Sequence, residues 1–176
     1  MTLSKHILIG AVILLFVGGC TAQHKLLGPY SKACKIRYQA ETFTDNWQSP
    51  HETAKLGTGD CEDQAFYLWH EFKKQGVKSR VVFGLLDIRR PNTLHAWVEM
   101  PMGFESLILD PSSGIMVPKS MMFMHYIEVH GIPGLTDKVT EFKKKTGLSG
   151  FNKIYENPDK LGVPMLILPQ SLKKIN

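Results

Sequence analysis

The stretch from Gly57 to Gly76 most constrains how this chain can fold. It reads GTGDCEDQAFYLWHEFKKQG, a glycine-containing loop followed by an uninterrupted helical pattern. Small or apolar side chains recur along one helical face at Cys61, Ala65, Leu68 and Phe72. Asp60 is a favourable N-cap, and Gly76 suits the position just after a helix. We therefore predict a helix over 61–75 whose apolar face packs against a second layer.

Three segments after this helix have the pattern of strands. Residues 79–88 (SRVVFGLLDI) are apolar and β-branched, and residues 92–100 (NTLHAWVEM) alternate between apolar and polar side chains. Residues 105–110 (ESLILD) return after the turn PMGF. A helix followed by a strand and a hairpin predicts an α+β fold, with the helix packed on an antiparallel sheet.

The pattern weakens beyond residue 114. We predict a basic surface helix over 137–147 and a late edge strand over 162–169, where two prolines disfavour a central strand. The methionine-rich residues 115–134 are either ordinary core or an adaptable surface. The length of 176 residues, without a clear linker, indicates one domain.

The N-terminus has the pattern of a targeting segment. Lys5 precedes an apolar run that ends in Val-Gly-Gly-Cys20, which resembles a bacterial lipobox. We predict three regions: a lipoprotein signal peptide over 1–19, a lipidated tether over 20–30 and a single domain over 31–176. An uncleaved anchor helix is the alternative. Because Thr21 follows the acylated cysteine, we expect attachment to the outer membrane of the cell envelope, facing the periplasm.

Charge and cysteine content exclude some classes of function. The net charge is +5, but no Lys/Arg cluster with interleaved aromatic residues indicates a nucleic-acid partner. With Cys20 lipidated, Cys34 and Cys61 remain, and they either pair in an oxidising compartment or stay as free thiols. No CxxC or Cys/His array predicts zinc. A monomer is expected.

Cys61, His95 and Asp110 are the candidate catalytic residues. The start of a helix lowers the pKa of a thiol, which favours Cys61 as a nucleophile. If PMGF is a four-residue loop, His95 pairs directly with Asp110 across the hairpin, with Cβ atoms about 5 Å apart. A carboxylate at that separation can hold one imidazole nitrogen and direct the other at a nucleophile. Taken alone, a histidine within a strand is more often a polar residue with satisfied hydrogen bonds than a catalytic one. An aspartate before proline, taken alone, usually forms a turn.

The segments WQSPHETAKLGTGDCEDQA, LHAWVE and LILDPSSG together resemble the bacterial transglutaminase-like cysteine proteinases. LapG-type periplasmic adhesin proteases are the best-known members, and the resemblance covers about residues 47–115. It implies a papain-like, transglutaminase-like fold with Cys61 as nucleophile, His95 as general base and then acid, and Asp110 as the orienting residue. It also implies an oxyanion held by the Cys61 backbone N–H and a second donor, for which Trp47 and Gln48 are candidates.

The same resemblance implies bound calcium. The matching ligand positions are Asp60, Glu62 and Asp63, and clustered carboxylates suit the oxygen ligands that Ca²⁺ requires. Alternatively, these acids cap the helix and form ion pairs with a Lys or Arg, such as Arg80 or Arg37.

We therefore expect a thiol hydrolase that cleaves a periplasmic or cell-surface protein, such as an adhesin, through a thioester intermediate. A lipid anchor at Cys20 would hold the protein on the membrane. One alternative is a transglutaminase or acyltransferase that uses the same three residues. Another is a lipoprotein that keeps the fold as a non-catalytic binding module.

Overall fold

The computed structural model describes residues 24–40, 46–87, 94–122, 125–129, 132 and 134–148. The predicted signal peptide, Cys20 and the late strand over 162–169 lie outside these residues. Within this part of the chain, no helix is long and apolar enough to cross a membrane.

The described part of the chain has four α-helical segments: residues 24–33, α2 (Pro50–Leu56), α3 (Cys61–Lys74) and α4 (Leu135–Thr146). The first includes most of the segment predicted to be a tether. Its Leu26 and Tyr30 pack against the core. The predicted tether is therefore helical over residues 24–30 and contacts the core.

Helix α3 confirms the central prediction. The side chain of Asp60 accepts a hydrogen bond from the backbone N–H of Asp63, as expected of an N-cap. The helix ends at Lys74, and Gly76 follows with φ of +70°, a conformation that glycine adopts at little steric cost.

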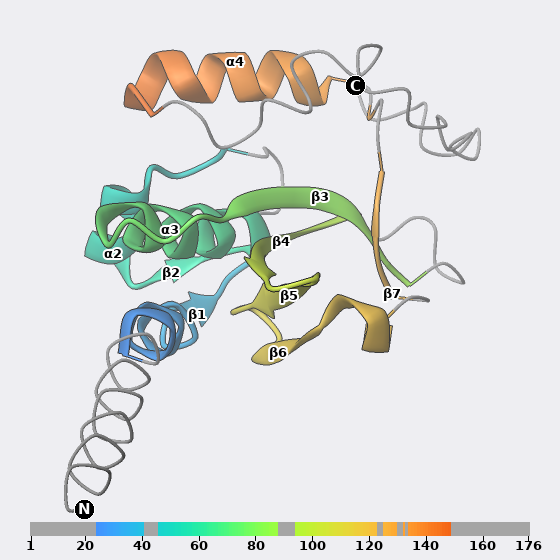
Figure 1. The fold of residues 1–176 in the computed structure, drawn as a ribbon. Helices are drawn as coiled ribbons and strands as arrows, with labels where there is room; N and C mark the ends of the chain where they lie inside the picture. Colours follow the sequence, from blue (N-terminus) through green and yellow to red (C-terminus); the bar gives the residue numbers. More distant parts are fainter. Residues whose placement is uncertain are drawn as a thin grey trace, which may run out of the picture.

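The main sheet has five antiparallel strands in the order β6-β5-β4-β3-β7 (Figure 1). Their bounds are β3 Arg80–Asp87, β4 Leu94–Met102, β5 Glu105–Asp110, β6 Ile115–Pro118 and β7 His125–Glu128. A separate parallel pair joins β1 (Arg37–Tyr38) to β2 (Thr58–Gly59), immediately before α3. The predicted fold class, α+β with a helix on an antiparallel sheet, is confirmed.

Two apolar clusters lie on opposite faces of this sheet. Ala65, Phe66 and Phe72 of α3 pack on Phe83 and Val98 in the larger cluster. Helix α4 joins the same cluster through one buried face, so the predicted basic helix is only partly a surface helix. Its position above α3 and β3 is visible in Figure 1.

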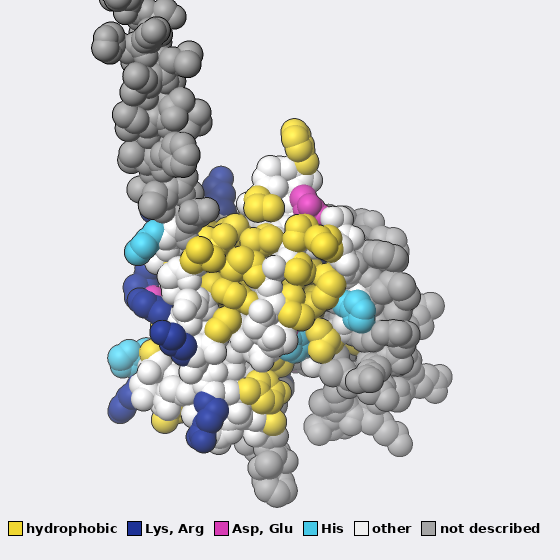
Figure 2. Space-filling model, turned by 90° about the horizontal axis from the view of Figure 1, so that it is seen from below, with side chains coloured by type: hydrophobic (Ala, Val, Ile, Leu, Met, Phe, Trp, Pro, Cys, Tyr) yellow, Lys and Arg dark blue, Asp and Glu magenta, His cyan; other side chains and the backbone are white. Residues whose placement is uncertain are grey.

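The opposite face of the sheet carries the smaller cluster, which contains Val82, Trp97, Ile108 and Tyr126. Figure 2 shows apolar side chains gathered on the side of the molecule where β6 and the short 3-10 helix η1 (Lys119–Met122) lie.

The predicted register of the β4–β5 hairpin is wrong by two residues. Met102 pairs with Glu105 across a two-residue turn, in which Gly103 has φ of +64°. Glycine makes this tight connection available, so the four-residue loop is not needed. Because side chains alternate with a period of two, the shift leaves His95 and Asp110 on the same face of the sheet, as diagonal neighbours.

Candidate functional site

Cys61 is the first residue of α3 and follows a tightly packed approach from β2. A Cβ atom at Gly59 would lie 2.7 Å from the Cβ of Asp63, so the chain requires glycine there. The Cys61 thiol donates a hydrogen bond of 3.0 Å to Oε2 of Glu62. Cys61 and Cys34 are both free, which excludes the alternative of a disulfide between them in this structure.

The pKa of the Cys61 thiol is strongly raised. Burial is the largest cause, and the Glu62 carboxylate adds to it through its charge and by accepting the thiol proton. The Asp60 carboxylate raises the pKa further, while the backbone N–H of Ala96 acts in the opposite direction. Burial and the neighbouring carboxylates therefore outweigh the lowering expected from the helix start, and the sulfur is a thiol in this structure.

His95 and Asp110 form the contact that the sequence predicts. Nε2 of His95 lies 2.7 Å from Oδ2 of Asp110, and the two side chains are 10% and 0% exposed. The contact is confirmed, although the direct pairing from which it was predicted is wrong. With Nε2 directed at the carboxylate, Nδ1 is the ring nitrogen left to exchange a proton with another group.

Asp110 is held by a set of donors from the following turn and from β7. They are the backbone N–H and hydroxyl groups of Ser112 and Ser113 and the phenol of Tyr126. Burial alone would raise the pKa of Asp110, but hydrogen bonds and charge from His95, with hydrogen bonds from the two serines, hold it well below its usual range. Asp110 is therefore a carboxylate at neutral pH.

Cys61 and His95 line one cavity of about 280 Å³, which brings two of the three candidate residues together. The cavity lies where α3 meets the start of β4, since the Cys61 thiol contacts the backbone of Ala96, the residue after His95. Helix α4 supplies part of the opposite wall through Leu135 and Lys138. The sequence prediction did not include this contribution, because nothing in the pattern of α4 indicates what it faces.

Trp47 lies at the same cavity, and its indole Nε1 is a buried donor without a hydrogen-bond partner. The ring stacks on Phe83 with centroids 5.3 Å apart. Gln48 does not line the cavity, and its backbone N–H donates to Oδ1 of Asp63. Of the two predicted second oxyanion donors, the structure places only Trp47 beside Cys61.

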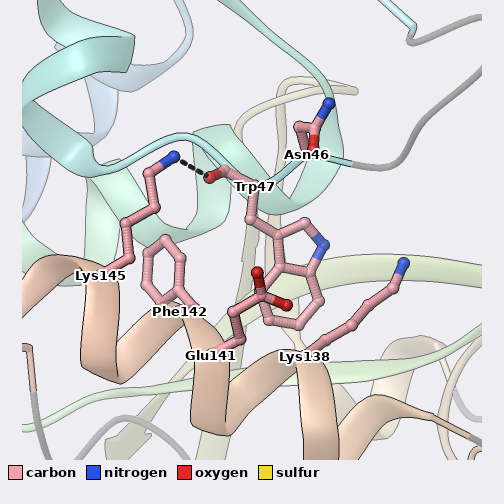
Figure 3. A pocket seen from close by; sticks show the side chains of 6 residues that line it. All are labelled: Asn46, Trp47, Lys138, Glu141, Phe142 and Lys145. Atoms are coloured by element: carbon pink, nitrogen blue, oxygen red, sulfur yellow. Dashed lines mark hydrogen bonds between the residues drawn. The ribbon is translucent and has the colours of Figure 1, made fainter.

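A smaller pocket of about 90 Å³ is also lined by Trp47 (Figure 3). Its wall on α4 includes Lys138 and Lys145, and Nζ of Lys145 donates to the Trp47 backbone oxygen at 3.3 Å. Trp47 and Lys138 line both cavities. The hydrogen bond from Lys145 to Trp47 holds the loop before α2 against α4, at the edge of the site.

The three predicted calcium ligands have separate contacts in the structure. Asp60 caps α3, Glu62 accepts the Cys61 thiol, and Asp63 is buried with Oδ1 2.7 Å from the Gln48 N–H. Across the described ranges, no three His, Cys, Asp or Glu residues converge as a metal site. By donor type the three acids fit calcium, because each supplies carboxylate oxygens. Gln48, whose backbone N–H contacts Asp63, has a buried Oε1 without a hydrogen-bond partner, which is a further oxygen donor.

The alternative role of these acids is confirmed for the helix cap, while Arg80 is not their partner. Asp60 caps the helix as expected. Arg80, however, forms its ion pairs with Glu99 and Glu128, both at 2.7 Å, on the sheet face away from α3.

Comparison with solved structures supports the fold. Structures of Legionella pneumophila LapG are similar to this chain: a calcium-bound form at 25% identity and TM-score 0.52, and an EGTA-treated form at 26% identity and TM-score 0.50. The alignments cover 59% and 57% of this chain and 61% and 57% of those chains, so the likeness spans about six-tenths of LapG. No curated protein matches.

A family model described as the transglutaminase-like superfamily matches residues 22–111, about half of the chain. This range contains the loop before α3, the helix itself and the hairpin that carries His95 and Asp110. The chain therefore belongs to the transglutaminase-like superfamily.

Proposed function

We propose that this protein is a cysteine peptidase that uses Cys61 as nucleophile, His95 as general base and acid, and Asp110 as the orienting carboxylate. The observation that carries the proposal is the 2.7 Å contact between His95 and Asp110 beside the cavity that His95 shares with Cys61. The similarity to LapG supports the same assignment.

The proposed reaction proceeds through a thioester. His95 Nδ1 takes the proton from Cys61, and the thiolate sulfur bonds to the carbonyl carbon of a substrate amide. The C–N bond then breaks, and the departing amine takes the proton from His95. Water, deprotonated by His95, attacks the thioester, which releases the acid and returns the proton to the sulfur.

Two donors are proposed for the oxyanion of the tetrahedral intermediates. The Cys61 backbone N–H is one of the first N–H groups of α3, which have no partner within the helix. The Trp47 Nε1 is a buried donor without a partner in the structure, so it can bind a developing negative charge without breaking an existing hydrogen bond.

Calcium is proposed as a ligand of the first turn of α3. The LapG structure with bound calcium supports this, as do the three acids that flank Cys61, namely Asp60, Glu62 and Asp63. A bound cation would supply positive charge that offsets the carboxylates next to Cys61.

The proposed substrate is a protein of the cell envelope, such as a surface adhesin. The proposed location follows from the lipobox-like segment at Cys20, which would anchor the domain on the outer membrane facing the periplasm. Both statements concern the whole protein and are separate from the assignment of the reacting residues.

Competitive labelling tests the assignment in the chain from Thr21, because only Cys34 and Cys61 then remain. Iodoacetamide is added near neutral pH, and each cysteine is quantified by peptide mass spectrometry. With millimolar calcium present to offset the charges of Asp60 and Glu62, we expect Cys61 to react faster than Cys34 and to lose this advantage in His95→Ala, while Cys34 is unchanged. Equal rates in the unmodified chain would exclude a thiol enzyme and favour the non-catalytic module.

Profiling with a peptide library then separates the two enzyme classes. New carboxyl termini that appear without added amine indicate hydrolysis. Products that form only with an amine present would instead assign acyl transfer.

A further inference from the structure

We propose that Tyr126 of β7 is a positioning residue for the His95–Asp110 pair. The inference rests on the proposed function, because it gives Tyr126 a role in the same site. The Tyr126 phenol donates to Oδ2 of Asp110 at 2.8 Å, the same oxygen that His95 contacts. This phenol therefore limits where the carboxylate oxygen can lie relative to the imidazole.

The surroundings of Tyr126 fit a role in which its position is fixed. The side chain is 2% exposed and packs edge-to-face on Trp97, with centroids 5.3 Å apart. Its ring centroid lies 6.2 Å from that of His95, and its hydroxyl is 3.2 Å from Oγ of Ser113. The Tyr126 hydroxyl thus contacts both Asp110 and Ser113, which itself donates to Asp110.

The backbone at Tyr126 gives independent support. Among the described residues, Tyr126 alone has a positive φ without being glycine, at +55°. A bulky side chain in this region costs conformational energy, and such strain persists where the surrounding structure fixes the residue, often at functional sites. Here the strained backbone belongs to the residue whose phenol reaches Asp110.

Asp110 has a second tyrosine contact that provides a matched control. The Tyr30 phenol donates to the backbone oxygen of Asp110 at 3.4 Å, and it also forms a hydrogen bond with Cys34. Tyr126→Phe and Tyr30→Phe therefore remove the same chemical group near the same residue. Only Tyr126→Phe removes a hydrogen bond to Oδ2.

The test follows the proton on His95 Nε2 by NMR in the chain from Thr21. Its resonance is identified by its absence in His95→Ala. We expect Tyr126→Phe to shift or abolish this resonance and to slow the labelling of Cys61 about tenfold, because the orienting carboxylate is no longer fixed. Tyr30→Phe should leave both readouts unchanged. Charged groups that share the site are Asp110, Glu62 and Lys138, and all are intact in both variants.

Thermal unfolding separates positioning from stability. The proposal is overturned if Tyr126→Phe lowers only the Tm. In that case the chemical shift of the His95 Nε2 proton is unchanged, and the labelling rate of Cys61 stays within twofold of that of the unmodified chain. If Tyr126→Phe fails to fold, 3-fluorotyrosine at position 126 replaces it. This phenol is a stronger donor, so the His95 resonance should move; an unmoved resonance counts against the proposal. If Cys61 is not labelled faster than Cys34 but the His95 resonance still shifts in Tyr126→Phe, the proposed peptidase function is wrong and the positioning role of Tyr126 is supported.

Discussion

The Cys61 thiol donates its hydrogen bond to Glu62, the residue next to it in α3, at 3.0 Å. This contact directs the thiol proton toward the Glu62 carboxylate, while the proton stays on the sulfur. Together with burial, it raises the pKa of Cys61. Formation of a thiolate therefore requires that this contact be broken or that its charge be offset.

We expect Glu62→Gln to lower the pKa of Cys61, because the substitution removes a negative charge that disfavours the thiolate. The labelling rate of Cys61 at neutral pH, measured in EGTA, should increase about tenfold for each unit by which the pKa falls. Asp137→Asn, an exposed acid in the first turn of α4, is the control and should have no effect. A slower reaction in Glu62→Gln would mean that this carboxylate assists the thiol.

Calcium should act in the same direction as Glu62→Gln. A divalent cation at Asp60, Glu62 and Asp63 would offset the charges that raise the Cys61 pKa and would bind only the folded state, so millimolar calcium should raise the Tm. Differential scanning calorimetry with calcium and with EGTA measures the shift. The Asp60→Asn/Glu62→Gln variant should lose it. If the Tm of the unmodified chain is the same with calcium and with EGTA, the protein does not bind this ion.

Asp110 should contribute to stability in a pH-dependent manner. Its pKa is lower in the folded state, so its contribution is complete above its unfolded pKa near 4 and is lost as the pH falls toward the folded value. Asp110→Asn places an amide N–H₂ among donors and should cost about 3 kcal/mol at pH 7. Urea unfolding from pH 7 to pH 2 tests this. The difference between the two chains should shrink below about pH 4, and a constant difference would contradict it.

The local sequence was sufficient to predict α3, its cap at Asp60 and the candidate residues Cys61, His95 and Asp110. The contact between His95 and Asp110 was predicted despite a wrong register, since an error of two residues keeps side chains on one face. Tyr126 could not be found in this way. Its role depends on a long-range pairing of β7 with β3 and on a positive φ that no tyrosine in a strand-like segment indicates.

Gly84 allows β7 to approach β3, and its substitution should separate them. A Cβ at Gly84 would overlap the backbone oxygen of Ile127 and lie 2.8 Å from the Trp97 ring. Since backbone cannot move as a side-chain end can, we expect Gly84→Ala to lower the free energy of unfolding by about 2 kcal/mol or more. It should also displace Tyr126, next to Ile127, and so weaken the His95 Nε2 proton resonance.

Gly28→Ala is the matched control for this substitution. Gly28 lies in the helix over 24–33, and apart from its chain neighbours nothing lies within 4 Å of a Cβ at that position. Because Pro29 follows it and offsets the gain from a better helix former, we expect Gly28→Ala to change the free energy of unfolding by less than about 1 kcal/mol. Urea denaturation of both variants measures the contrast. Equal stability of the two alanine variants would show that β7 can move away from Gly84 without cost, and that the close approach of the strands is not required.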